Sequence, residues 1–142
     1  MEISEIIDSY GKDYLILDFD SIFITDKIED EMIMYFPKKN LKEALRDFEA
    51  MLLKLFNISS YDRGKSLSKY SGGERSIICF CLITIVIKKN IIHNLKIIFN
   101  NIIESLSTNN RLIIKDQMFF LNNEFNVSIY QIKNGDVCKY EL

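Results

Sequence analysis

The eleven residues from 77 to 87 are apolar except for Thr84, and this run constrains the fold more than any other feature. Such a run must lie in a core, and it is shorter than the roughly 18 residues that a membrane-spanning helix needs. Its many β-branched residues would also suit a strand. The preceding segment Ser71-Gly72-Gly73-Glu74-Arg75-Ser76 offers an N-cap serine and a charged first turn, and Lys88-Lys89-Asn90 suit a helix C-terminus. We therefore predict a buried helix that begins near the two glycines.

Ser71, Gly72, Gly73 and Glu74 form the one segment that is suited to hold a phosphate group. Two adjacent glycines let backbone N–H groups approach an anion closely, and the helix dipole favours negative charge at this end. In the alternative interpretation the glycines only let the chain turn into the buried helix. The sequence leaves both interpretations open.

Residues 70–87 resemble the signature motif and the following helix of ABC-type ATPases. The sequence Ser-Gly-Gly-Glu-Arg at 71–75 most resembles the motif of the chromosome-maintenance branch of that family, the SMC, RecF and RecN proteins. The resemblance also favours a helix for the apolar run, and it implies a compact, degenerate P-loop NTPase-like α/β fold with one head-like domain over residues 1–142. In the family this motif closes over ATP held by the opposite subunit, so the resemblance implies a protein partner or a homodimer.

The other motifs of that family are altered here. The apolar segment 96–99 lies where the family has its Mg²⁺-binding strand, but Asn100 and Asn101 stand in place of the following Asp and Glu. Magnesium prefers anionic oxygen and the second carboxylate must accept a proton from water, so neutral amides serve poorly. Residues 36–42 hold the P-loop position without a glycine, and Gly64-Lys65-Ser66 copies only the end of a P-loop, in a polar loop.

The resemblance therefore predicts a pseudoenzyme that acts as an interaction or scaffolding subunit. Association with DNA is implied by the resemblance alone. In a second version of this hypothesis, the signature motif completes a partner's ATPase site in trans. No cofactor is expected for the chain alone, and ATP with Mg²⁺ is expected only with a partner.

A competing hypothesis rests on Asp18 and Asp20. An apolar strand that ends in Asp-x-Asp resembles the first motif of haloacid-dehalogenase-type phosphatases, in which the first Asp attacks phosphorus and the second transfers protons beside Mg²⁺. Both side chains would project from one face of a strand. The family continues with Gly-Thr, whereas this chain has Ser21-Ile22. In the alternative interpretation, Asp18 and Asp20 lie on the solvated face of a strand. The alternation of acidic and apolar residues along this segment favours that interpretation.

Hydrophobic spacing predicts the remaining elements. We expect an N-terminal β-meander, then a helix, a loop, the buried helix, and a strand–helix–strand unit that ends in an Asn134-Gly135 turn. Alternation of strands and helices predicts mostly parallel pairing. The expected meander strands are 14–17, 22–25 and 32–36, the expected helices are 41–57 and 109–124, the loop is 58–70, and the later strands are 96–99 and 127–132.

Composition restricts the partners and the location. With 18 basic and 20 acidic side chains the net charge is −2, so the whole molecule does not attract nucleic acid. The acidic N-terminus lacks the apolar core of a signal peptide, and we expect a soluble intracellular protein of the cytoplasm or nucleus. The three cysteines lack the spacing of a zinc site, and Cys79 and Cys81 are expected to be small core residues.

Overall fold

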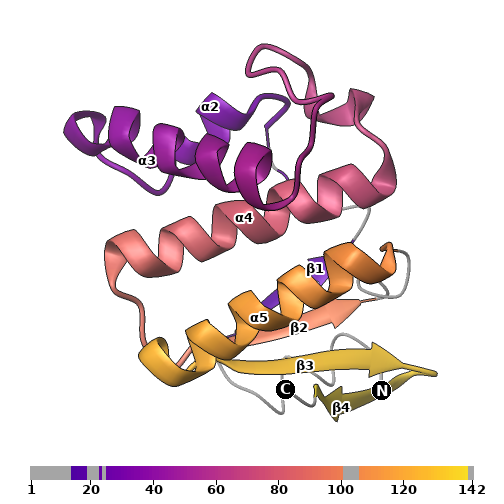
Figure 1. Ribbon diagram of the computed structural model, residues 1–142. Coiled ribbons are helices and arrows are strands. Elements are labelled where there is room, and N and C mark those ends of the chain that lie inside the picture. The colour runs from indigo at the N-terminus through magenta and orange to yellow at the C-terminus, as the bar shows by residue number, and fades with distance from the viewer. Residues whose placement is uncertain (1–13, 19–22, 24, 101–105, 141–142) are drawn as a thin grey trace. The chain divides into compact units, whose positions relative to one another are not determined.

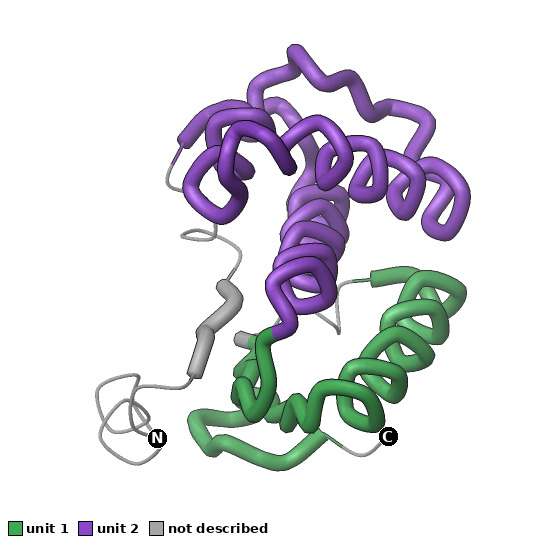
Figure 2. The backbone as a smooth tube through the Cα atoms, turned by 90° about the vertical axis from the view of Figure 1, so that its left-hand side faces the viewer, with its two compact units in different colours: residues 1–20, 92–142 green, residues 21–91 purple. Residues whose placement is uncertain are grey.

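The computed structural model describes residues 14–18, 23, 25–100 and 106–140. The chain divides into two compact units, one of residues 1–20 with 92–142 and one of residues 21–91 (Figure 2). Helices and a mainly parallel sheet confirm the predicted α/β class (Figure 1). The finer P-loop NTPase-like assignment and the single domain over residues 1–142 stay predictions.

The first unit is built on a four-stranded sheet in the order β1-β2-β3-β4. The first three strands pair in parallel and the last pair is antiparallel, which confirms the predicted mostly parallel pairing. Three consecutive side chains of β2, at positions 97, 98 and 99, are buried, so this strand is covered on both faces. The strands are β1 (Tyr14–Asp18), β2 (Lys96–Asn100), β3 (Ser128–Lys133) and β4 (Asp136–Lys139).

Helix α5 (Thr108–Phe125) connects β2 to β3 and contacts β3 (Figure 1). Its buried residues Ile114, Met118 and Leu121 recur at the predicted spacing of four and three. The hairpin between β3 and β4 turns at Asn134 and Gly135, which both have positive φ, as a two-residue hairpin turn requires. The predicted strand–helix–strand unit and its turn are therefore confirmed within one or two residues at each end.

The second unit is helical. Its longest element, α4, holds the apolar run, and ten of its residues are buried. The hydroxyl of Thr84, the polar residue in the run, donates to the Phe80 carbonyl at 2.8 Å, so the buried oxygen is satisfied inside the helix. Among the described residues no helix is long and apolar enough to cross a membrane. The elements are α2 (Ile28–Ile33), α3 (Lys38–Ala50), the π-helix η1 (Met51–Leu55), the 3-10 helix η2 (Leu67–Lys69) and α4 (Gly72–Asn90).

The predicted β-meander is wrong after its first strand. Strand 14–17 is present as β1, but residues 32–36 end helix α2 and form the following turn. The buried side chains of Ile28, Met32 and Phe36 are four residues apart, which is helical spacing. Three acidic residues in the first turn of α2 also favour a helix start. Of the expected strand 22–25, positions 22 and 24 lie outside the described residues, and Phe23 and Thr25 are not in a strand.

The helix predicted at 41–57 is confirmed and starts three residues earlier. Pro37 holds the N-cap position with φ −63°, a value that suits the entry into a helix. The buried residues Ala44, Leu45 and Phe48 form the inner face of α3, and η1 continues the coil with Leu52 buried. Residues 36–42, which the resemblance places at the P-loop, form a turn and the start of α3.

Candidate functional site

Ser71 caps the start of α4, as the sequence predicts. Its Oγ accepts a hydrogen bond from the backbone N–H of Glu74 at 3.2 Å, and the Glu74 carboxylate accepts from the N–H of Ser71 at 3.0 Å. This pair of bonds is a capping box, which satisfies two amides that the helix leaves without partners. The Arg75 amide donates to the Ser71 carbonyl at 2.9 Å and begins the helical ladder. The Glu74 carboxylate therefore closes the capping box at the start of α4.

The amides of Gly72 and Gly73 occupy the first two positions of α4 and have no acceptor within the helix. The Ser71 hydroxyl lies beside them on an exposed residue, and it can still donate its own proton because its bond to Glu74 uses a lone pair. The two glycine amides and the Ser71 hydroxyl are thus three donors at the positive end of a 19-residue helix. That Ser71, Gly72, Gly73 and Glu74 contact a phosphate stays a prediction.

A carboxylate and a lysine set the charge at this helix start. Oε2 of Glu74 also accepts a hydrogen bond from the Ser60 hydroxyl. The bonds from Ser60 and from the Ser71 amide lower the pKa of Glu74, and the positive charge of Lys65 lowers it further. The site therefore carries a fixed negative charge at neutral pH. The positive charge of Lys65 partly offsets this negative charge.

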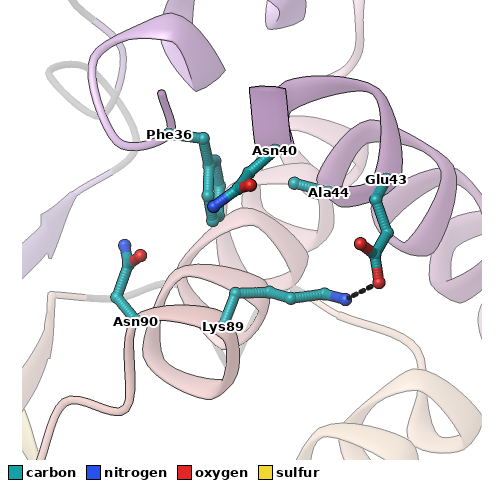
Figure 3. A pocket seen from close by; sticks show the side chains of 6 residues that line it. All are labelled: Phe36, Asn40, Glu43, Ala44, Lys89 and Asn90. Carbon is teal, nitrogen blue, oxygen red and sulfur yellow. Dashed lines mark hydrogen bonds and ion pairs between the residues drawn. The ribbon is translucent and has the colours of Figure 1, made fainter. Parts of the chain in front are cut away.

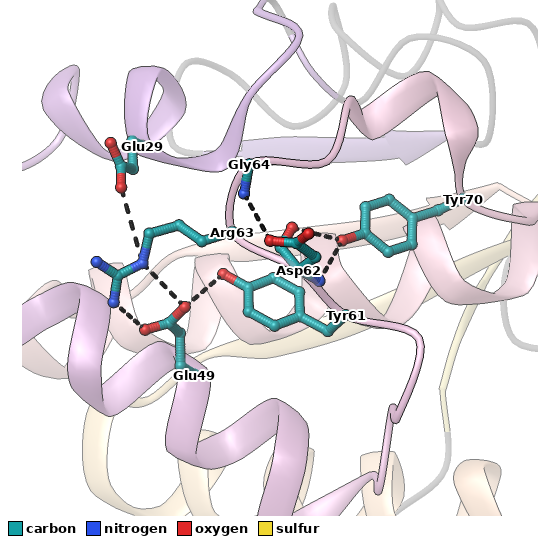
Figure 4. A network of polar contacts seen from close by, with 7 residues as sticks. All are labelled: Glu29, Glu49, Tyr61, Asp62, Arg63, Gly64 and Tyr70. Atoms are coloured by element: carbon teal, nitrogen blue, oxygen red, sulfur yellow. Dashed lines mark hydrogen bonds and ion pairs between the residues drawn. The ribbon is translucent and has the colours of Figure 1, made fainter.

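Tyr70 holds together the loop that leads into α4. Its hydroxyl donates to the Asp62 carbonyl and accepts from the Asp62 amide, each at 3.0 Å (Figure 4). Its ring stacks on Tyr61 with the centroids 6.5 Å apart, and Nζ of Lys65 lies 4.3 Å from the ring centroid. A cation over an aromatic face is attracted to the ring. These contacts of Tyr70 with Tyr61, Asp62 and Lys65 hold the two ends of the loop together directly before the candidate site.

Arg63 and Tyr61 fasten the same loop to helix α3. Nε of Arg63 donates to Oε2 of Glu49 at 3.1 Å, Nη2 donates to Oε1, and the Tyr61 hydroxyl donates to Oε2 at 2.8 Å (Figure 4). Glu29 adds a longer contact to Arg63 Nε at 3.7 Å. The hydrogen bond from Arg63 holds the pKa of Glu49 below its usual value, and burial together with Glu49 raises the pKa of Tyr61. The predicted loop 58–70 is therefore attached to α2 and α3 by these side-chain contacts.

The Gly64-Lys65-Ser66 tripeptide uses its groups within the loop. The Gly64 amide donates to Asp62 Oδ1 at 3.1 Å, and Nζ of Lys27 donates to the Gly64 carbonyl at 2.6 Å. The Ser66 hydroxyl donates to the Asp26 carboxylate. Only a three-residue 3-10 helix follows, so the helix N-terminus that a P-loop requires is missing. This segment is a braced turn, as its context in the sequence suggested.

The acidic and amide positions of the first unit meet at one edge of its sheet. Because β1 and β2 are parallel, their carboxyl ends share an edge, and Asp18 is the register partner of Asn100. Asn101, Asp20 and Ser21 lie outside the described residues. The predicted strand before Asn100 is confirmed, and so is the strand before Asp18.

Sequence reasoning missed the residues that brace the candidate site. Ser60 is 14 positions from Glu74, and Arg63 is 14 positions from Glu49, so neither pair follows a local spacing rule. The available signal was the pair of tyrosines, Tyr61 and Tyr70, in an otherwise polar loop. Aromatic rings in such a segment need a packing partner, and here each ring stacks on the other.

Comparison with protein-family models, with curated proteins and with solved structures finds no match to the chain. No group of three His, Cys, Asp or Glu residues among those described could hold a metal ion. Cys79 and Cys81 are buried as expected, and burial raises the pKa of both thiols.

Proposed function

We propose that the chain is a catalytically degenerate relative of ABC and SMC ATPase heads that acts as an interaction or scaffolding subunit. The observation that carries the proposal is the start of α4, where the Ser-Gly-Gly-Glu segment forms a helix N-terminus closed by a capping box. The order α4, β2, α5, β3 with parallel β2 and β3 supports it, because the family resemblance implies an α/β arrangement after the signature.

The missing acids support the loss of catalysis. Asn100 ends β2 where the resemblance places the Mg²⁺-binding aspartate, and an amide offers no negative charge to the metal. Asn101 stands in the place of the general base, and an amide cannot accept a proton at neutral pH. A partner protein or a second copy is part of the proposal. Its link to DNA follows from the resemblance alone.

A second candidate function is a half-site that completes a partner's ATPase site in trans. The exposed Ser71 and the Gly72 and Gly73 amides favour it, since these donors face no acceptor within α4. In this version the chain contributes to ATP hydrolysis without holding ATP alone. The Gly73→Asp variant separates the two functions. It should abolish a joint ATPase activity in the half-site version, and it should leave assembly unchanged in the scaffolding version.

The test is thermal unfolding of the purified full chain with and without Mg-ATP. We expect no shift, because residues 36–42, which the resemblance places at the P-loop, contain no glycine and cannot wrap the β- and γ-phosphates. A ligand present at 100 times its dissociation constant would add about 2.7 kcal/mol to stability. A matched variant, Asn100→Asp with Asn101→Glu, restores the acidic pair without a P-loop and should also show no shift. A saturable shift in the native chain would contradict the proposal.

A further inference from the structure

The turn between α2 and α3 exposes three consecutive apolar side chains. Ile33, Met34 and Tyr35 are exposed by 57%, 46% and 42%, whereas the next residue, Phe36, is exposed by only 4% and anchors the turn in the core of the second unit. The backbone is fixed by bonds from the Tyr35 and Phe36 amides to the Met32 carbonyl, each at 3.0 Å. The turn is therefore preformed, with its apolar side chains outside.

The end of α4 supports this turn from the side. The Asn90 side-chain amide donates to the Tyr35 carbonyl at 3.2 Å. Figure 3 shows Phe36 and Asn90 on either side of a small polar pocket, with Lys89 reaching across it to Glu43. Nζ of Lys89 lies 2.9 Å from Glu43 and 2.5 Å from Asp47, so its positive charge offsets one of the two negative charges on this part of α3.

Positive charge follows directly after the apolar turn. Lys38, Lys39, Lys42 and Arg46 are exposed on α3, and none of them forms an ion pair with any described residue. The first turn of α3 contains no acid. Lysines at a helix N-terminus face the positive end of the helix dipole, which disfavours them for stability. The apolar turn is thus followed along the chain by exposed cations that form no ion pair within the described part of the protein.

We propose that this surface, formed by Ile33, Met34 and Tyr35 with Lys38, Lys39 and Lys42, docks on membranes that carry anionic lipids. Apolar and aromatic side chains at a preformed turn enter the headgroup boundary, and neighbouring lysines contact the lipid phosphates. Charge complementarity selects the occupant. The aliphatic side chains of Ile33 and Met34 offer nothing to a phosphodiester backbone, so the surface suits a lipid headgroup layer rather than a nucleic acid.

This surface is separate from the candidate anion site. Asn90 and Ser71 lie at opposite ends of α4, and a helix of 19 residues is about 28 Å long. Membrane docking therefore does not depend on the proposed ATPase relationship. Failure of one proposal leaves the other intact.

The test is sedimentation of the full chain with vesicles of phosphatidylcholine, alone or mixed with phosphatidylserine. Binding should occur only to the mixed vesicles and should weaken as salt is raised. Each lysine near an anionic surface contributes a factor of about five, so Lys38→Gln with Lys39→Gln should weaken binding about 30-fold. Met34→Ser should also weaken it. Neither change should lower the melting temperature, because these side chains are exposed and the lysines oppose the helix dipole.

A matched variant removes the same charge elsewhere. Lys115→Gln with Lys133→Gln, both exposed in the first unit, should leave vesicle binding unchanged. Equal loss in both double variants would overturn the proposal, since it would show a general charge effect. Absence of vesicle binding, equal binding to both vesicle types, or binding to duplex DNA in place of vesicles would overturn it as well.

Discussion

Replacing Ser71 by alanine tests the structural role of the signature serine. The change removes the acceptor of the 3.2 Å bond from the Glu74 amide but leaves the bond from the Ser71 amide to the Glu74 carboxylate. Loss of an N-cap serine costs about 1 kcal/mol. For a chain of 142 residues this corresponds to a fall of about 3–4 °C in the melting temperature. Urea denaturation followed by circular dichroism measures the free energy of unfolding, and hydrogen exchange shows the loss of protection in the first turn of α4.

Ser107 provides the matched control. It caps α5 and accepts from the Asn110 amide, also at 3.2 Å, outside the signature segment. Ser107→Ala should therefore cost about the same 1 kcal/mol. If Ser71 also serves a shared nucleotide site, Ser71→Ala alone should reduce a joint activity with a partner. A cost below about 0.3 kcal/mol for Ser71→Ala would refute the capping argument.

Further changes test the loop, the glycine pair, the core and the phosphatase alternative. The hydrogen bond from Arg63 lowers the pKa of Glu49. This bond therefore stabilises the protein above the ordinary pKa of a carboxyl group, and the stabilisation is lost as the pH falls through the lowered pKa. Glu49→Gln should reduce the pH dependence of the free energy of unfolding between about pH 5 and pH 3, measured by urea denaturation. Gly73→Asp should leave the melting temperature unchanged or slightly higher, because an acid in the first turn suits the helix dipole. Phe48 is fully buried, and Phe48→Ala should cost about 3–5 kcal/mol in the same denaturation assay. A phosphatase would show Mg²⁺-dependent turnover of a phosphomonoester that disappears in Asp18→Asn, and we expect no turnover in either protein.

The sequence predicted the second half of the chain well. A strong periodic signal, such as the spacing of Ile114, Met118 and Leu121, survives because it reflects burial on one helix face. The Ser71 cap was predictable for a similar reason, since the capping box is a local pattern of four residues. Short segments near the N-terminus failed. The six apolar and acidic residues of α2 are compatible with a helix or a strand when judged from the sequence. The burial of both Ile28 and Met32, four residues apart, identifies the helix.

The contacts that hold the loop before the candidate site could not be predicted from the sequence. Glu49 and Arg63 come from different elements, and their contact depends on the path of the loop 58–70 over α3. The same limit applies to Lys89, whose ammonium group contacts Glu43 and Asp47 on α3. Such pairings arise from tertiary packing, which no fixed spacing along the chain encodes.

We propose that the start of α4 is derived from an ATPase signature in a chain without the phosphate loop and the acidic pair. Titration of the purified full chain with Mg-ATP, followed by calorimetry and by phosphate release, is the decisive experiment. We expect neither saturable binding heat nor phosphate release from the chain alone. Saturable binding of Mg-ATP, or steady phosphate release that persists through further purification, would contradict it.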